Sequence, residues 1–127
     1  MTGSGAGWFA TGALLAGLAV ILGAFGAHGL KARVSPELLV IWETGVRYHV
    51  YHAFGLLAVA WAQSRWPGPL CGAAGWLFLV GILVFSGSLY AMTLTGIRWL
   101  GAVTPLGGLA FIAGWVALAL AAFRGSS

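Results

Sequence analysis

The sequence has 127 residues, of which 61% are hydrophobic and only 6% are charged, and its mean hydropathy is +0.98. This composition excludes a soluble globular domain and indicates one integral membrane domain, residues 1–127, with bilayer lipid as its surroundings. The net charge of +4 comes from scattered Lys and Arg residues, so no nucleic-acid partner is expected. A single cysteine, Cys71, excludes an internal disulfide.

Four apolar runs predict four membrane-spanning helices, because a helix needs about 20 apolar residues to cross the hydrocarbon core. The runs are residues 8–27, 37–63, 70–94 and 99–123. The connectors between them are short, so consecutive helices should be antiparallel neighbours. We therefore expect an all-α fold, an integral membrane up-down four-helix bundle with short connectors.

The first run, residues 8–27, is interpreted as a helix and not as a cleaved signal peptide, because no basic residue precedes it. Small residues in the first and last runs recur every three or four positions, and such stripes let helices pack closely in lipid. They are Gly12, Ala16, Ala19, Gly23 and Gly26, and Gly107, Ala110, Gly114, Ala117 and Ala121. Packing within the chain is the simpler interpretation of both stripes, and homo-oligomerisation is the alternative.

The second run should begin after Ser35 and Pro36, a capping residue followed by a first-turn proline, and end before Pro67. His49 and His52 fall on one seam of this helix, so both imidazoles should face the same neighbour. Glu43 and Arg47 lie one turn apart on another face with the acid first. This order favours an ion pair between them.

Polar residues of all four runs gather on one side of the membrane, the side of the connector that carries Lys31. They are His28, Tyr48, His49, His52, Ser86, Ser88, Tyr90 and Thr104. Ionisable residues inside a membrane usually face a bundle interior or a wet cavity. We expect a buried polar network or pocket, in which His52 contacts Ser88 or Tyr90 and His28 approaches from the first helix.

Three interpretations of the histidines remain open, namely structural hydrogen bonds, a site for a small molecule, lipid headgroup or proton, and a metal or haem site. Structural hydrogen bonding is the simplest. No metal and no other cofactor is expected, because no carboxylate partner and no CxxCH motif accompanies the histidines. Asp is absent and no phosphate-binding loop or nucleophile motif is present, which argues against an enzyme.

Basic residues indicate the orientation of the chain. Lys31, Arg33 and Arg98 lie in the first and third connectors, whereas Arg65 and Arg124 lie on the opposite side. The excess of cations in cytoplasmic loops then predicts that both termini lie outside the cytoplasm.

Three segments carry a resemblance to a known family. They are "GAFGAHGLK" (residues 23–31), "FSGSLYAMTLTG" (residues 85–96) and "TPLGG" (residues 104–108). Together with the entry to the second run they resemble the YgdD- and YwdK-like family of small inner-membrane proteins, which has eukaryotic relatives in the small TMEM class. The resemblance extends over all four runs and implies a multi-pass protein of the cell (inner or plasma) membrane with unassigned activity.

The resemblance also implies which polar residues are shared with the family. These are His28, Tyr48, His52, Ser86, Ser88, Tyr90, Thr104 and Pro105. The chain departs from the family at His49, where relatives carry Gln, and at Glu43 and Arg47, where relatives vary. Gln is a poor ligand for soft metals or haem, so a metal site on His49 and His52 is further disfavoured.

The sequence thus predicts a non-enzymatic membrane protein with a polar intramembrane pocket for a lipid headgroup, a small solute or protons. The alternative is an accessory or assembly subunit of a larger membrane complex, in which the polar residues only hold the bundle together. A pocket requires an open cavity with a polar lining. A subunit requires a helix face that a partner covers.

Overall fold

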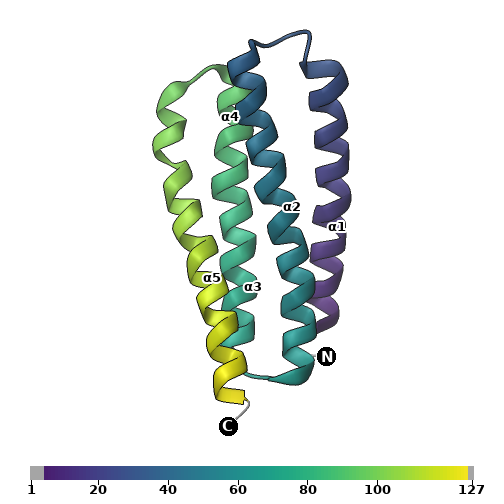
Figure 1. The fold of residues 1–127 in the computed structure, drawn as a ribbon, viewed down its shortest axis with the longest axis vertical. Coiled ribbons are helices and arrows are strands. Elements are labelled where there is room, and N and C mark those ends of the chain that lie inside the picture. Colours follow the sequence, from purple (N-terminus) through teal and green to yellow (C-terminus); the bar gives the residue numbers. More distant parts are fainter. Residues whose placement is uncertain (1–4, 126–127) are drawn as a thin grey trace.

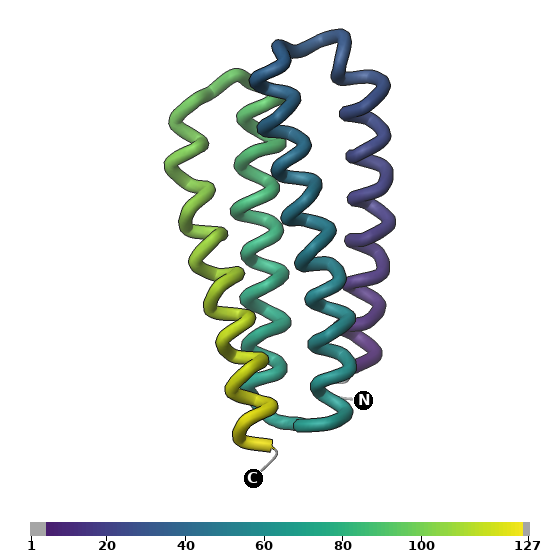
Figure 2. Tube along the Cα trace, in the orientation of Figure 1, coloured from purple at the N-terminus to yellow at the C-terminus, as the bar shows by residue number. Residues whose placement is uncertain are grey.

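A computed structural model describes residues 5–125, and these residues form helices and no strand. Four helical rods lie side by side and alternate in direction, so that the first rod begins and the last rod ends at the same end of the molecule (Figure 1). Figure 2 shows that the connections between the rods are short. The all-α prediction is confirmed for the described part of the chain.

Two rods form the first half. The first is α1 (Gly5–Phe25), which continues into a π-helical turn, η1 (Gly26–Leu30), and the second is α2 (Pro36–Arg65). The predicted start of α2 is confirmed, because the side chain of Ser35 accepts a hydrogen bond from the Leu38 N–H at 3.2 Å. The helix ends before Pro67, as expected.

The second half contains interruptions that the sequence pattern did not reveal. The third rod consists of α3 (Pro69–Gly81), a π-helical turn η2 (Ile82–Ser86) and α4 (Gly87–Thr95). The fourth rod begins with a 3₁₀ turn, η3 (Arg98–Ala102), and continues as α5 (Thr104–Gly125). One extra residue in a helical turn scarcely changes the apolar spacing, so the run 70–94 reads as one continuous helix.

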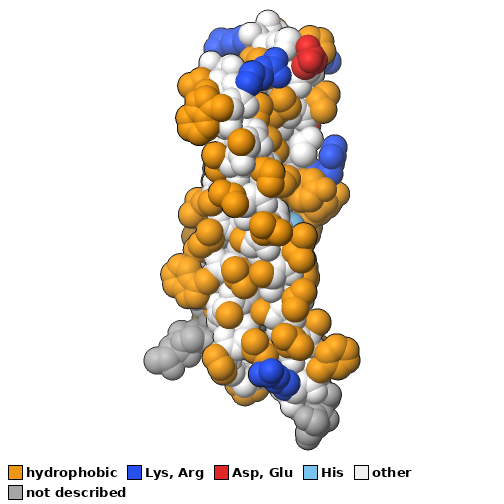
Figure 3. Space-filling model, turned by 90° about the vertical axis from the view of Figure 1, so that its left-hand side faces the viewer, with side chains coloured by type: hydrophobic (Ala, Val, Ile, Leu, Met, Phe, Trp, Pro, Cys, Tyr) orange, Lys and Arg blue, Asp and Glu red, His pale blue; other side chains and the backbone are white. Residues whose placement is uncertain are grey.

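Three rods are long and apolar enough to cross a membrane, judged by length and composition: Gly5–Leu30, Pro69–Thr95 and Arg98–Gly125. The remaining rod, α2, is long enough with its 30 residues but is not apolar enough to meet this standard. The reason is its polar content, which includes two charged residues and two histidines between positions 43 and 52. On the face shown in Figure 3, hydrophobic side chains cover most of the length between the ends, where basic side chains gather.

The rods do not form a closed ring. α2 is central and packs against α1, α3 and α4 and more lightly against α5, while α5 packs mainly on α3. Within the described residues, α1 and α5 share at most marginal contact. The small-residue stripes serve these contacts, since a Cβ on Gly12 would lie 2.8 Å from the Ala53 carbonyl and one on Gly107 would clash with the Phe85 backbone. Packing within the chain is therefore what the stripes do.

The half of the molecule that holds the chain ends has an apolar core. Its main cluster lies between α2, the third rod and α5 and consists of Leu56, Val59, Ala74, Phe78, Ile82, Phe111 and Ala117. Four of these side chains are completely inaccessible to solvent. The centre of this half is consequently dry and tightly packed.

Candidate functional site

Buried polar side chains occur only from the middle of the molecule toward the end that carries the α1–α2 connection, among the described residues. They are His49, His52, Ser86, Ser88 and Thr93. They come from α2, η2 and α4, which pack against one another. The fold therefore concentrates internal hydrogen-bonding groups in one half.

His52 uses both of its ring nitrogens. Nδ1 lies 2.8 Å from the Tyr48 carbonyl oxygen, and Nε2 accepts a hydrogen bond from the indole N–H of Trp115 at 3.0 Å. A carbonyl oxygen only accepts and an indole only donates, so these two partners together require a neutral ring with its proton on Nδ1. The ring also stacks on Phe111 with centroids 3.5 Å apart. His52 is thus fully engaged as a structural group.

The neighbours predicted for His52 are wrong. His52 contacts Phe111 and Trp115 on α5 and not Ser88 or Tyr90. His49, three residues earlier, turns instead to Tyr90 on α4. The two imidazoles are offset by about 60° around the helix, and α2 has a neighbour on each side, so a shared seam does not give a shared partner.

Only one of the two ring nitrogens of His49 has a well-formed hydrogen bond. Its Nδ1 lies 2.8 Å from the Tyr90 hydroxyl oxygen, and the side chain is 2% exposed. Its Nε2 is buried and has no well-formed hydrogen bond among the described residues, and the Leu15 backbone of α1 is at best a weak partner for it.

The donors and acceptors of His49 and Tyr90 favour one arrangement of their protons. If the Tyr90 O–H donates to Nδ1, one group is left unmatched, the Nε2–H of His49. If Nδ1–H donates instead, both the Tyr90 hydroxyl proton and the Nε2 lone pair are unmatched. Unmatched buried groups are costly, so the first arrangement is favoured, and it leaves a buried donor that faces α1.

The remaining buried hydroxyls join one helix to the next. The Ser86 hydroxyl donates to the Gly45 carbonyl on α2 at 2.7 Å, and the hydroxyls of Ser88 and Thr104 are 2.5 Å apart between α4 and α5. Thr93 donates to the Leu38 carbonyl on α2 at 3.2 Å. These bonds tie α4 to both of its neighbours.

Several predicted residues stand outside this network. The His28 side chain is exposed and makes no hydrogen bond to a described residue. The Tyr48 side chain makes only ring contacts, with Tyr51, His52 and Phe85, and Tyr48 enters the network through its backbone carbonyl alone. Glu43 and Arg47 are both exposed and form no ion pair with each other. The predicted ion pair is therefore not formed in this structure.

Two tryptophans belong to this hydrogen-bonded network but were not among the predicted site residues. Trp115 donates to His52, and the Trp42 indole donates to the Leu22 carbonyl of α1 at 2.9 Å while its ring packs 4.7 Å from that of Tyr90. Both stand inside apolar runs and not at run ends. That position was the available signal, because an indole N–H at membrane depth has no water nearby and needs an acceptor from the protein.

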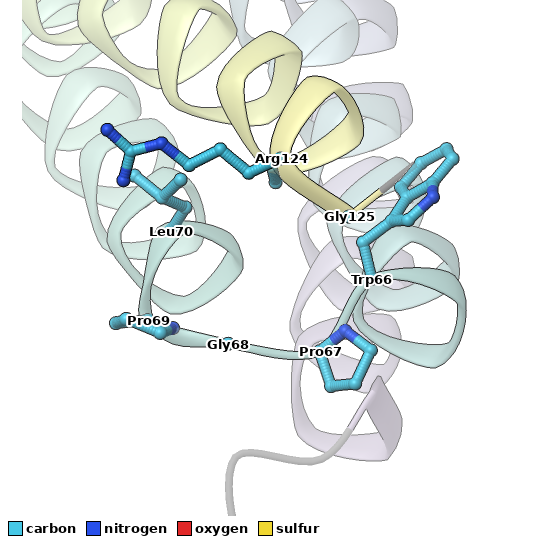
Figure 4. A pocket seen from close by; sticks show the side chains of 8 residues that line it. Trp66, Pro67, Gly68, Pro69, Leu70, Arg124 and Gly125 are labelled. Carbon is cyan, nitrogen blue, oxygen red and sulfur yellow. The ribbon is translucent and has the colours of Figure 1, made fainter. Parts of the chain in front are cut away.

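Two surface hollows lie elsewhere. One of about 230 Å³ lies between the α2–α3 connection and the end of α5, where Trp66 and Pro67 face Leu70 and Arg124 (Figure 4). Another, of about 490 Å³, lies between α1 and α2. Neither borders His49 or His52. Among the described residues, no three His, Cys, Asp or Glu side chains are grouped so as to hold a metal ion.

Comparison with known proteins supplies the family. Residues 22–108 match the family described as "Protein of unknown function (DUF423)". The chain belongs to the DUF423 family. It is similar to the UPF0382 membrane protein YwdK of Bacillus subtilis (strain 168), with 51% identity over 114 residues that cover 89% of this chain and 93% of the relative.

A second DUF423-type relative is a UPF0382 membrane protein of Staphylococcus haemolyticus, 46% identical over 113 residues that cover 89% of this chain and 92% of the relative. No solved structure gives a match. The predicted resemblance to YwdK-like proteins is thereby confirmed. With three rods of membrane-spanning character and relatives named as membrane proteins, this DUF423 chain is a membrane protein whose family has no assigned function.

Proposed function

We propose that this DUF423 protein is a non-enzymatic, four-span protein of the cell membrane that binds a small polar group at an intramembrane site built on His49 and Tyr90. The polar content of α2 fits a helix that crosses the bilayer at the centre of the bundle, with its histidines turned inward. The group bound is one that accepts a hydrogen bond, such as a lipid headgroup oxygen or a small solute.

One observation carries this proposal, the buried Nε2 of His49, which has no well-formed hydrogen bond and only the Leu15 backbone near it. Gln63 Oε1 is the other such atom among the described residues, and it lies near the opposite end of α2. Buried polar groups in folded proteins are nearly always hydrogen-bonded, so each exception calls for an explanation. His52, one turn away, shows that the same helix satisfies both nitrogens of a structural histidine. An acceptor from outside the chain would complete His49 in the same way.

The site lies in the polar half of the bundle and does not form a path across the membrane. Beyond His52, toward the chain ends, Leu56, Val59 and Phe78 fill the centre completely. In the other direction lie the hydroxyls of Ser86, Ser88 and Thr93. A bound group would therefore lie in the half of the bundle that carries Lys31.

The wall over the unpaired nitrogen is α1. The Leu15 backbone of α1 lies against the His49 ring, and α1 packs chiefly on α2 alone. A small outward shift of α1 uncovers Nε2 without disturbing the contacts of α4 and α5. Access to the site thus depends on the least enclosed helix.

Native mass spectrometry of protein released from lipid nanodiscs tests the proposal. The native chain should retain one small molecule or lipid, and Tyr90→Phe and His49→Leu should lose it. Tyr48→Phe is the matched control, since its hydroxyl bonds no described residue, and it should retain the same mass. Equal retention by all variants, or a bare native chain, would contradict a ligand site.

A second function, as a subunit of a larger membrane assembly, is favoured by a different observation. The outward face of α2 carries Glu43 and Arg47, both exposed. Charges on the outer surface of a membrane helix are unfavourable unless something covers them. This face is independent of the His49 site, which lies on the inner side of α2.

A further inference from the structure

One face of α2 points away from the other rods and repeats every seventh residue. Its positions are Val40, Arg47, Phe54 and Trp61. The three apolar members are 60%, 56% and 58% exposed, in that order. A seven-residue repeat is the spacing by which two parallel helices pack along a common seam, in membranes as in water.

The charges on this face lie level with the buried polar network. Arg47 stands two residues beyond Gly45, whose carbonyl accepts the Ser86 hydroxyl, and so it is well inside the rod. Helix α2 begins at Pro36, which lies about 16 Å from Arg47 along the helix axis at 1.5 Å per residue. Neither Glu43 nor Arg47 has an ion-pair or hydrogen-bond partner among the described residues. An occupant of this face should therefore supply both an acid and a base.

We propose that a second copy of this chain covers this face, with the two α2 helices parallel about a two-fold axis along the membrane normal. Copies inserted by the same topogenic signals share one orientation, and two-fold closure is the commonest association of identical chains. Glu43 of one copy then lies one turn from Arg47 of the partner subunit, and the reverse pair forms by symmetry. The face is self-complementary in charge.

The surface beside this seam also suits a helical partner. At the Trp61 end, the face opens into the apolar groove of about 490 Å³ between α1 and α2, which Gly5 and Phe9 line. An apolar side chain of a second copy fits such a groove. Charge pairing and apolar packing are thus available along one continuous surface, and this inference stands whether or not His49 binds a ligand.

Cysteine cross-linking in native membranes tests the arrangement. In a Cys71→Ser background, which removes the single native thiol, Phe54→Cys should give a disulfide-linked dimer on mild oxidation, because two-fold symmetry brings identical positions together. Leu109→Cys, on an exposed face of α5, is the control and should stay monomeric. Equal dimer from both positions, no dimer from Phe54→Cys, or a link to a different protein would overturn the proposal.

Charge reversal separates this arrangement from lipid binding by Arg47. Glu43→Arg and Arg47→Glu should each abolish the Phe54→Cys dimer, and the double reversal should restore it. All three changes are at exposed positions, so the fold should persist, and the melting temperature of each variant checks this. The reciprocal pairs do not exist if Arg47→Glu abolishes the dimer while Glu43→Arg leaves it intact. They also do not exist if the double reversal fails to restore the dimer.

Discussion

His52 illustrates how one side chain can hold two helices together. Its ring joins the α2 backbone to the Trp115 indole of α5 and stacks on Phe111. Such a residue contributes specificity as well as stability, because only one tautomer fits its partners. The histidine of an apolar helix is here a structural device and not a reactive group.

We predict that His52→Leu destabilises the bundle by about 1–3 kcal/mol, because the Trp115 N–H loses its acceptor in a low-dielectric interior. His52→Gln should lose less, since an amide keeps a donor and an acceptor. Thermal unfolding in detergent gives the comparison. Equal, negligible losses would show that the Trp115 bond contributes nothing.

Tyr90→Phe should also lose about 1–3 kcal/mol, because it removes the hydroxyl that donates to His49 and leaves a buried ring nitrogen unpaired. Tyr48→Phe is the matched change, since it removes a hydroxyl that bonds nothing described, and its effect should stay within about 0.5 kcal/mol. The same unfolding assay measures both. Indistinguishable melting curves for the two variants would speak against the His49–Tyr90 bond.

At the residue scale, the sequence indicated four of the buried polar residues, His49, His52, Ser86 and Ser88, but not Thr93 and not their pairing. Ser88 and Thr104 flank the third connector, and their hydroxyls are in contact. Depth along each run could not assign His49 to Tyr90 and His52 to Trp115, because that choice depends on how α4 and α5 flank α2. Helical periodicity defines a face of one helix and says nothing about the rotation of its neighbours.

At the scale of the helical elements, glycine determines how closely α5 approaches the third rod. A Cβ on Gly114 would lie 2.5 Å from the Phe78 ring, and Phe78 is completely buried. The stripe Gly107, Gly114 and Ala117 therefore fixes the spacing that lets Phe111 stack on His52. Close helix contact and the geometry of the polar network are coupled.

Gly114→Ala should accordingly destabilise the protein by about 1–3 kcal/mol through overpacking against Phe78. Gly17→Ala provides the control, because nothing lies within 4 Å of a Cβ there, and alanine is the better helix former. Thermal unfolding should separate the two. A stable Gly114→Ala variant beside a weakened Gly17→Ala variant would reverse the assignment of these faces.

For the helices, the apolar runs and the capping signal of Ser35 were sufficient to place the rods, with ends shifted by a few residues. The π turn Ile82–Ser86 was beyond sequence reasoning. It places Ser86 against the Gly45 carbonyl, and that contact belongs to the tertiary structure.

At the scale of the whole molecule, polarity is divided between two halves. One half is a dry apolar core, and the other contains the internal hydrogen bonds of α2, α4 and α5. Composition predicted the membrane and the helices, because an apolar chain must satisfy its backbone within helices there. It could not predict that α1 would pack almost solely on α2, since nothing in an apolar run specifies how many neighbours a helix has.

The orientation of the molecule follows from its basic connectors. Lys31, Arg33 and Arg98 lie at the polar end, so this end should face the cytoplasm and both termini should lie outside it. A reporter fused after Ser127 that works only in the cytoplasm should be inactive, and one that works only outside should be active. The opposite pair of results would invert the molecule.

The central claim is that both ring nitrogens of His52 are hydrogen-bonded within the chain, whereas only Nδ1 of His49 has a well-formed bond. Nitrogen NMR of the imidazoles tests this directly, because it reports which nitrogen carries the proton. The chain has only three histidines, so single substitutions assign every signal in protein held in nanodiscs at about pH 8, where histidine is ordinarily neutral. The account predicts a proton on Nδ1 for His52 and on Nε2 for His49. A proton on Nε2 of His52, or on Nδ1 of His49, would contradict it.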